Sequence, residues 1–592
     1  MTEPFPLRFA PGIVKSDSPY SLRGRYVDAD KVRFVKGQPE KHKGHVRFSD
    51  ETLTGIPRAA LAWDDFSANR RIAVGTHLKL ALAGTDGTIT NITPFRSTGT
   101  LGSDPFAVTD TSTTVVVTHT GHGNVVGSTV IFEGATAGGG IAIDGEYEVT
   151  SVIDANSYEI QHSAPATSTD ATTGGSSVDF SYEILPGFAN VSQGRGFGVG
   201  LYGAGTYGTP RSGSSFTQYP RTWSLDLYGQ NLLGMASGLF IYEWQPGVST
   251  RAAKVANSPS GQFMFVTNER FPVVLGAGGQ LMTIAWPDQN DITDWTPGEG
   301  KTAVSRRLQG GSRLICGAAL RPLQNVIWSD TSVFAMQYTG AILQVYSTPR
   351  IGDNCGIVGP HAFAIAGGIA YWRGSSNFFM YSGAVAPIPN ADDINDWLTA
   401  RLNGKQNWKC QAHYSPRYNE ITWFYVHADH NESAYYVAVC LNDFSWTVGT
   451  SDRVLLREAA GINAAVYGFS PGGVIYQHEI GVDADGEAMP WFLESSPLDI
   501  DNGSIIADVQ GYIPDFQRQA GPVELTLTGF DAPNEDTPID TVNKQIAEKQ
   551  GIVDMSFGAR QASIHLAGIT IGSDFRLGLP KLEVQGSGTR RP

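Results

Sequence analysis

Short runs in which apolar and polar residues alternate recur along the middle of the chain, each pair joined at a small residue. In one unit Leu232-Leu233-Gly234 leads to Leu239–Trp244, and in another Val273–Gly276 leads to Leu281–Trp286. A period of two over four to eight residues indicates a half-buried strand, so each unit predicts a strand, a tight turn and a second strand. The predicted turns fall at residues 234, 276, 329, 374, 427 and 468, between 41 and 53 residues apart.

This spacing is close to the roughly 40 to 50 residues that a four-stranded propeller blade occupies. An earlier unit of the same form, Ile72–Gly75 to Leu78–Leu82, lies far upstream of the others and predicts an insertion after it. A β-sandwich or a β-solenoid is also built from short alternating strands. Six units at blade spacing are hard to house in one sandwich, so we predict a mainly β protein with a β-propeller core.

Shifts in composition divide the chain into five expected parts. The insert is rich in Thr, Val, Ser and Gly and is typical of a small β-barrel or sandwich. A helix is expected over residues 390–402, because acids crowd its first turn and Arg401 lies in its last, as the helix dipole prefers. A short helix is expected over residues 541–548. The parts are a basic N-terminal arm (1–48), first propeller or platform strands (49–103), an inserted small β domain (104–182), the β-propeller (183–491) and a C-terminal β domain with a basic tail (492–592).

The arm is basic inside an acidic protein. Between Arg8 and Arg47 it holds ten basic residues against four acidic ones, and Gly and Pro interrupt it, which predicts an extended segment with short strands. One interpretation is a solvated first strand. The other is a docking arm for an acidic neighbour, including another copy of the chain. The basic residues are Arg8, Lys15, Arg23, Arg25, Lys31, Arg33, Lys36, Lys41, Lys43 and Arg47.

Charge and cysteine content narrow the class of protein. The formal net charge of the 592 residues is −15, whereas an ordinary nucleic-acid binder shows a basic footprint. We expect no membrane span, because no apolar run approaches the roughly 20 residues that crossing a bilayer requires, and the start lacks the features of a signal peptide. Cys316, Cys355, Cys410 and Cys440 form no Cys-x-x-Cys pair and are expected to be buried thiols of a chain that folds in a reducing cytoplasm.

Two motifs in the chain resemble ligand sites. Gly198, Gly200 and Gly203 spell a dinucleotide fingerprint, but more Gly, Tyr, Pro and Ser follow where a helix should begin, so a flexible loop over residues 194–208 is expected. His119 and His122 are spaced loosely like metal ligands. No third or fourth ligand is evident nearby, which favours a polar turn.

Two acidic runs resemble the carboxylate pairs of glycoside hydrolases. They are Asp483–Glu487 and Asp499–Gly503, and both contain the Asp-Gly or Asn-Gly steps that hairpin turns demand. We expect turns at both places. The chain also lacks the serine-elbow, zinc-helix and phosphate-loop motifs. We therefore predict no catalytic, cofactor-binding or metal-binding residues, no cofactor, and a protein that is not an enzyme.

The order of these parts resembles the tail-nozzle, or packaged-DNA stabilisation, proteins of short-tailed bacteriophages. The opening Pro11–Lys15 with Gly24–Phe34 is similar to the start of such virion proteins, and Thr118–Gly123 lies in an insert similar to small β modules of phage structural proteins. The helix after Ala386–Pro389 and the last strand near Leu582–Gln585 complete the resemblance, which spans nearly the whole chain. The Gly/Tyr loop and the insert depart from the plainest members and leave the number of blades open.

The resemblance implies a structural virion protein of the tail, assembled in the host cytoplasm into a homohexamer beneath the portal and adaptor rings. Such a ring closes the DNA channel after packaging and conducts DNA during ejection, and it contacts the head-to-tail adaptor or portal complex and the tail fibres or spikes. Viral DNA would pass without sequence-specific binding. The acidic charge agrees, because a negative tunnel repels phosphate and favours sliding over binding.

Two other functions stay open. A phage tail propeller protein that binds or hydrolyses host-surface glycans would place Trp372, Trp423 and Trp446 against sugars, although these aromatics fall on predicted blade strands, where they commonly fill the core. A host-encoded propeller that acts as an interaction module is the third possibility, and it would be a monomer in solution.

Overall fold

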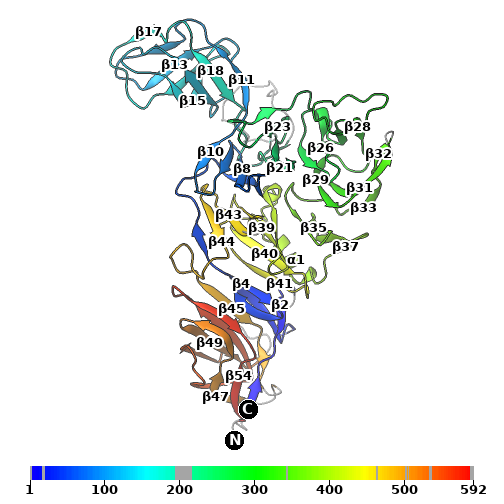
Figure 1. Cartoon of the computed structure of the whole chain (residues 1–592). Helices are drawn as coiled ribbons and strands as arrows, with labels where there is room; N and C mark the ends of the chain where they lie inside the picture. Colours follow the sequence, from blue (N-terminus) through cyan, green and yellow to red (C-terminus); the bar gives the residue numbers. More distant parts are fainter. Residues whose placement is uncertain are drawn as a thin grey trace, which may run out of the picture.

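The computed structural model describes residues 3–16, 21–193, 217–341, 344–459, 461, 464–500, 503, 506–532 and 537–586. It is elongated, with a propeller in the middle, the insert projecting at one end and a terminal β domain at the other (Figure 1). The first and last described strands, β1 and β54, pair at the tip of that terminal domain. The Gly/Tyr loop and the basic tail expected from the sequence fall outside the described residues.

Within the described residues, seven four-stranded antiparallel blades form the propeller, which confirms the predicted fold class. The seven strand pairs identified in the sequence are the second and third strands of these blades. Two predicted turns are wrong, because Gly234 and Gly468 lie inside strands. Listed from the inner to the outer strand, the first four blades are blade 1, β7 (Pro57–Asp64), β8 (Arg70–Thr76), β9 (Leu80–Ala83) and β10 (Ile89–Asn91); blade 2, β21 (Trp223–Tyr228), β22 (Asn231–Ala236), β23 (Ile241–Trp244) and β24 (Ala253–Lys254); blade 3, β25 (Phe263–Val266), β26 (Pro272–Leu275), β27 (Thr283–Trp286) and β28 (Val304–Arg307); and blade 4, β29 (Leu314–Arg321), β30 (Gln324–Ser329), β31 (Ser332–Ala341) and β32 (Gln344–Ser347), with β33 (Arg350–Asp353) also paired to β31.

The ring closes through a strand from the other end of the sequence. The outer strand of blade 7 is β6, whose Val46 pairs with Gln477 of β44. Adjacent inner strands such as β21 and β25, and β25 and β29, contact each other, and between blades 4 and 5 Trp328 stacks on Phe363 with ring centroids 4.9 Å apart. The remaining blades are blade 5, β34 (Phe363–Ala366), β35 (Ile369–Arg373), β36 (Phe378–Tyr381) and β37 (Val385–Pro387); blade 6, β38 (Gln411–Ser415), β39 (Glu420–Tyr425), β40 (Tyr435–Cys440) and β41 (Trp446–Thr450); and blade 7, β42 (Leu455–Ala459), β43 (Ala465–Phe469), β44 (Ile475–His478) and β6 (His45–Arg47).

Helix α1 (Asp392–Thr399) lies between blades 5 and 6 and confirms the expected helix with a shorter extent. It buries Ile394 and Leu398 against the blades, while Asp392 and Asp393 occupy its first turn. Two short 3-10 turns, η1 (Ala277–Gly279) and η2 (Asn407–Lys409), follow β26 and precede β38. The four cysteines are buried free thiols, as expected.

The insert folds about its own hydrophobic core and leaves the propeller between β10 and β21. It begins earlier than the expected residue 104, because β11 already pairs with β18 across its base. Apolar residues on one face of its alternating strands, such as Val115, Val130 and Tyr158, are fully buried in this core. Its strands are β11 (Phe95–Thr100), β12 (Phe106–Val108), β13 (Thr114–Thr118), β14 (Thr129–Glu133), β15 (Gly145–Val152), β16 (Ser157–Gln161), β17 (Asp170–Thr173) and β18 (Asp179–Glu183), and β19 (Ser192–Gln193) pairs with β20 (Thr217–Gln218) beyond it.

The terminal domain is built from both ends of the chain, which corrects the expectation of a separate arm over residues 1–48. Five N-terminal strands enter its three sheets: β1 pairs with β54, β3 with β45 and β5 with β53. The segment predicted as a helix over residues 541–548 is instead the strand β50, because its backbone pairs with β49 at a sheet edge. The strands are β1 (Glu3–Pro6), β2 (Ala10–Ile13), β3 (Arg25–Asp30), β4 (Val32–Val35), β5 (Gln38–Lys41), β45 (Trp491–Ser495), β46 (Leu498–Asp499), β47 (Ala507–Ile513), β48 (Phe516–Ala520), β49 (Val523–Phe530), β50 (Asp540–Ile546), β51 (Val553–Ala559), β52 (Gln561–Gly568), β53 (Asp574–Leu577) and β54 (Lys581–Gly586).

The basic residues of the N-terminal segment neutralise acids of the same chain. Arg25 pairs with Asp393 of α1 at 3.2 Å, and Lys43 pairs with Asp574 at 3.3 Å. One hydrophobic cluster also runs from the blades into the terminal domain, where Phe34 and Trp446 belong to it together. The segment is therefore neither a solvated strand nor a free docking arm, since the fold itself uses its charges and its apolar face.

No helix in the described residues is long and apolar enough to cross a bilayer.

Candidate functional site

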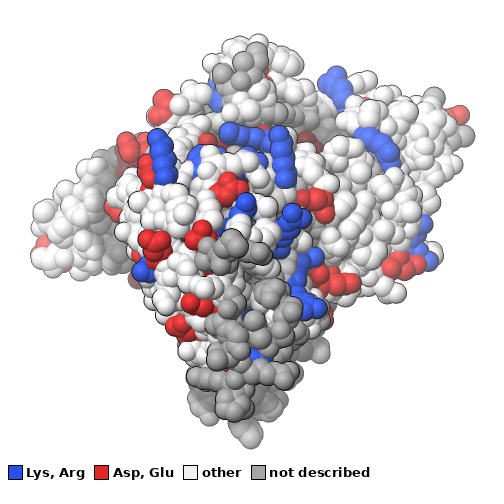
Figure 2. Space-filling view, turned by 90° about the horizontal axis from the view of Figure 1, so that it is seen from below, with Lys and Arg blue, Asp and Glu red and all other residues white. Residues whose placement is uncertain are grey.

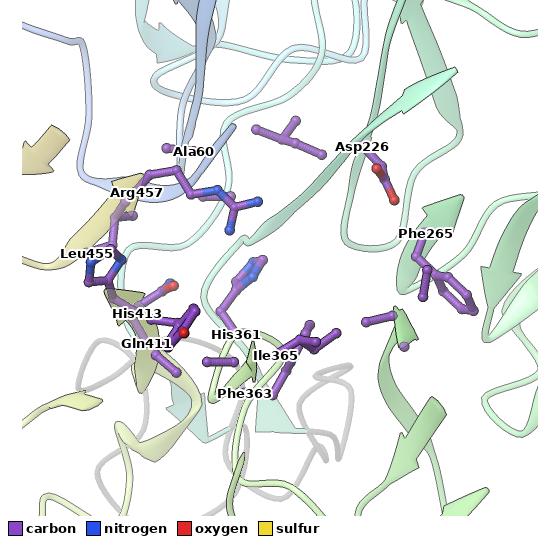
Figure 3. A pocket seen from close by; sticks show the side chains of 18 of the residues that line it. Ala60, Asp226, Phe265, His361, Phe363, Ile365, Gln411, His413, Leu455 and Arg457 are labelled. Carbon is purple, nitrogen blue, oxygen red and sulfur yellow. The ribbon is translucent and has the colours of Figure 1, made fainter. Parts of the chain in front are cut away.

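The propeller axis holds a cavity of about 480 Å³ that residues from all seven blades line (Figure 3). Each inner strand is paired on one side only, so its free edge faces the axis. The volume lies within the roughly 300 to 1,000 Å³ typical of small-molecule sites. This is the volume of a small molecule. A DNA duplex, whose major groove alone is about 12 Å wide and 8.5 Å deep, is too large to enter it.

One end of the cavity is closed by hydrogen bonds between blades that are not neighbours. His361, just before β34 of blade 5, donates from Nε2 to the Trp223 carbonyl of blade 2 at 2.8 Å. Gln411 of blade 6 donates from Nε2 to the Arg58 carbonyl of blade 1, also at 2.8 Å. Trp223 is held in place by Gly75, where a Cβ would stand 2.3 Å from the indole, so only glycine allows blades 1 and 2 to approach this closely.

A buried ion cluster covers the same end. Glu432 accepts from both terminal nitrogens of Arg58, at 2.6 and 2.7 Å, and from Lys409 Nζ at 2.8 Å. Arg58 and Lys409 are each 2% exposed. Burial raises the pKa of Glu432, but the bonds and charges of the two cations outweigh this effect and hold it below its usual value. Burial also lowers the pKa of Lys409 to about 8. The segment after the insert joins this cluster, because the Ala189 carbonyl accepts from Arg58 at 2.9 Å.

The cavity lining holds one cation, Arg457 of blade 7, and two carboxylates, Asp226 of blade 2 and Glu458 of blade 7. Arg457 reaches the axis from β42 beside Ala60, and Asp226 points inward from β21 (Figure 3). Asp226 is fixed by the Val266 amide, which donates to Oδ2 at 2.8 Å. Burial raises the pKa of Asp226 and lowers that of Arg457. Although the blades surround Arg457, its side chain is solvent-exposed, because it stands in the open lumen and not between packed strands.

Two histidines complete the polar lining. Burial, together with the charge of Arg457, lowers the pKa of His361 to about 4 and that of His413 to about 3. Both rings are therefore neutral at pH 7. His361 uses its Nε2 proton on the Trp223 carbonyl, so in the neutral ring Nδ1 is an acceptor.

A second polar cluster joins the N-terminal segment to blades 6 and 7. Arg33 of β4, 4% exposed, donates to Glu479 at 2.9 Å and lies 3.9 Å from Glu420. Its guanidinium stacks 3.7 Å above the Tyr418 ring. Since Glu479 follows β44 and Glu420 begins β39, this arginine connects three parts of the fold that are distant in sequence.

The sites considered from sequence turn out to be structural. His119 Nδ1 bonds the Tyr182 hydroxyl at 2.6 Å, and His122 accepts from the Asn124 amide at 2.9 Å, as expected for a polar turn. In the described part of the chain, no group of three or more His, Cys, Asp or Glu residues is placed to hold a metal ion. Residues 483–487 form a turn, closed by a bridge between Ala484 and Glu487. The turn expected at residues 499–503 is described only in part.

The three tryptophans considered as sugar platforms are core residues. Trp372, Trp423 and Trp446 are at most 1% exposed, and each indole donates to a backbone carbonyl of the blade junctions. Sequence analysis did not identify the residues that line the axial cavity. The only sequence signal was a charged pair, Arg457-Glu458, within the otherwise apolar strand β42.

The described fold defines a seven-bladed β-propeller with an inserted β domain and a terminal β domain shared by both chain ends. No family model matches the chain, and no curated protein matches it. Among solved structures it is similar to phage phi92 endosialidase (11% identity, 80% of this chain and 69% of that chain, TM-score 0.17). It is also similar to the Dos1 propeller (9%, 76% and 97%, 0.30) and to virginiamycin B lyase from Staphylococcus aureus (8%, 73% and 97%, 0.23). At these TM-scores the likeness carries no argument about function.

Proposed function

We propose that this chain is the structural subunit of a phage tail nozzle, a homohexameric ring that closes the DNA channel after packaging and conducts DNA during ejection. The observation that carries the proposal is the arrangement of the subunit. A propeller lies between a projecting insert and a terminal domain, and the latter shares one hydrophobic core with the blades (Figure 1). An elongated subunit whose body and terminal domain are firmly joined suits a wall element of a ring with closed symmetry.

The cavity geometry supports a channel between copies over a channel through one chain. The propeller axis is too narrow for duplex DNA, and bonds between blades that are not neighbours cross one end of it. On the face seen from below, Lys and Arg are interspersed with Asp and Glu (Figure 2). A mixed surface on a chain of net charge −15 suits DNA that slides past without being gripped.

Particle mass with a low-resolution image tests the proposal. We expect six-fold rings with six times the mass of one chain, formed alone or with the adaptor ring of the same virion. A particle that stays monomeric with its adaptor contradicts the proposal. The rings should retain duplex DNA negligibly at physiological salt. Tight retention that weakens steeply as salt rises contradicts passive conduction, because that slope reports phosphate contacts.

A glycan-binding or glycan-cleaving tail protein is the competing proposal, and the size of the axial cavity is the observation in its favour. Trp372, Trp423 and Trp446 do not support it, because their side chains are buried and cannot stack on sugars. Incubation of the purified protein with host-surface polysaccharide separates the two functions. A fall in polysaccharide chain length favours the glycan-cleaving function, and an unchanged chain length together with ring formation favours the nozzle.

A further inference from the structure

The axial cavity has the chemistry of a binding site for a small anion. Among the described residues that line the cavity, Arg457 is the only one with a full positive charge at pH 7. Its guanidinium makes no hydrogen bond and no ion pair within 4 Å to any residue that the structure describes. The Arg457 side chain is solvent-exposed in the lumen, so its donors are available to a ligand, and hydrogen bonds to charged groups are among the strongest that proteins form.

Blade 2 and the start of blade 5 present acceptors to the cavity. Asp226 is oriented by the Val266 and Leu227 amides, both at 2.8 Å, and each carboxylate oxygen retains a free lone pair. The His361 ring points into the cavity from below in Figure 3, with Nδ1 as an acceptor because Nε2 donates to the Trp223 carbonyl. A ligand that fits these groups carries an anionic group toward Arg457 and hydroxyl donors toward Asp226 and His361.

The cavity is shaped to admit such a molecule from one side. The end at the strand starts is closed by the His361 and Gln411 bonds, whereas the exposed Asn268, beyond the end of β25, lines the cavity farther along. Ala60 lies beside Arg457 and leaves room that a larger side chain would fill.

We infer that the propeller axis of each subunit is a binding site for a small hydroxylated carboxylate, with Arg457 as its anion anchor and Asp226 and His361 as hydroxyl acceptors. This inference does not rest on the nozzle function, because the site lies within one chain and is complete in a monomer.

Isothermal titration of the full-length protein tests the site with four probes: glucuronate, glucose, acetate and inorganic phosphate. Glucuronate should bind, and glucose, which lacks the charge, and acetate, which lacks the hydroxyls, should bind at least 10-fold more weakly. A charge-assisted hydrogen bond contributes about 1.5 to 3 kcal/mol, so Arg457→Met should weaken glucuronate binding roughly 10- to 100-fold. Arg350→Met, at an exposed ion pair with Asp353 that is not part of the cavity lining, is the matched control and should leave binding unchanged.

A second variant distinguishes loss of binding from misfolding of Arg457→Met. Ala60→Leu keeps every charge but fills the space beside Arg457, and it should also abolish glucuronate binding while the melting curve shows a folded propeller. Absence of glucuronate binding to the wild type at millimolar concentration overturns the inference. So does phosphate that binds as tightly as glucuronate, since the hydroxyl acceptors would then have no role, and so does equal binding by Arg457→Met and wild type.

Discussion

Replacement of Arg33 tests whether the N-terminal segment is structural. In Arg33→Met the apolar side chain keeps much of the volume but removes the cation that Glu479 contacts at 2.9 Å and Glu420 approaches at 3.9 Å. Two carboxylates then share a site with no arginine between them, and Glu420 is only 4% exposed. The change removes no strand, so its effect reports the charge network alone.

The burial of this network sets the expected magnitude. Removal of one partner of a buried ion pair typically costs about 3 to 5 kcal/mol, because the remaining charge stays desolvated. Burial raises the pKa of Glu420, and Arg33 opposes that rise. Without Arg33 the folded-state pKa rises further above the unfolded value. Proton uptake then relieves the repulsion in the folded state, so the difference between variant and wild type should shrink as the pH falls from 7 to 5.

Hydrogen exchange of the β4 and β5 amides under increasing urea measures the opening free energy of this region. Arg23→Met is the matched control, since Arg23 lies in the same segment and pairs with Asp499 at 2.8 Å but is 57% exposed. An exposed pair contributes about 0.2 to 1 kcal/mol, so the control should lose no more than that. Equal losses for Arg33→Met and Arg23→Met, or a difference that grows at pH 5, would refute the reasoning.

Three further predictions concern other parts of the fold. Replacement of residues 95–183 by a short Gly-Ser linker should leave a folded propeller by limited proteolysis, because the insert has a separate core and loop closure depends weakly on length; loss of soluble expression would place the insert in the propeller core. Glu432→Gln should lower the unfolding free energy by about 3 to 5 kcal/mol in urea titrations, since it leaves Arg58 and Lys409 buried without an anion; unchanged stability would show that solvent reaches both cations. The unfolding free energy should also fall as the pH is lowered from 6.5 to about 4. The folded pKa values of His361 and His413, about 4 and about 3, lie below that of an unfolded histidine, so the unfolded state takes up protons first. Each should contribute about 2 kcal/mol of loss between pH 6.5 and pH 5, and a stability that rises over this range in urea titrations would contradict the assignment of both as neutral.

Much of the propeller was predictable because each blade repeats one local pattern. Leu232–Gly234 and Leu239–Trp244 predict two strands by alternation alone, and the same reasoning identifies the insertion after Leu82. The helix after residue 390 was predictable because acidic residues occupy its first turn. The strand after residue 540 was not predictable. Its sequence has a helical pattern, but its backbone pairs with β49, and sequence spacing does not reveal that partner.

The sequence by itself determined the class of fold, since strand period and blade spacing are local properties that survive in any arrangement of the chain. Only the tertiary structure decided how the ring closes and where a ligand fits. The closing strand β6 and its partner β44 are more than 400 residues apart. The basic arm became part of the terminal domain because its charges meet acids such as Asp393 and Asp574 only after folding. Arg457, Asp226 and His361 are likewise isolated residues on three blades, and they form one cavity because seven inner strands converge on a common axis.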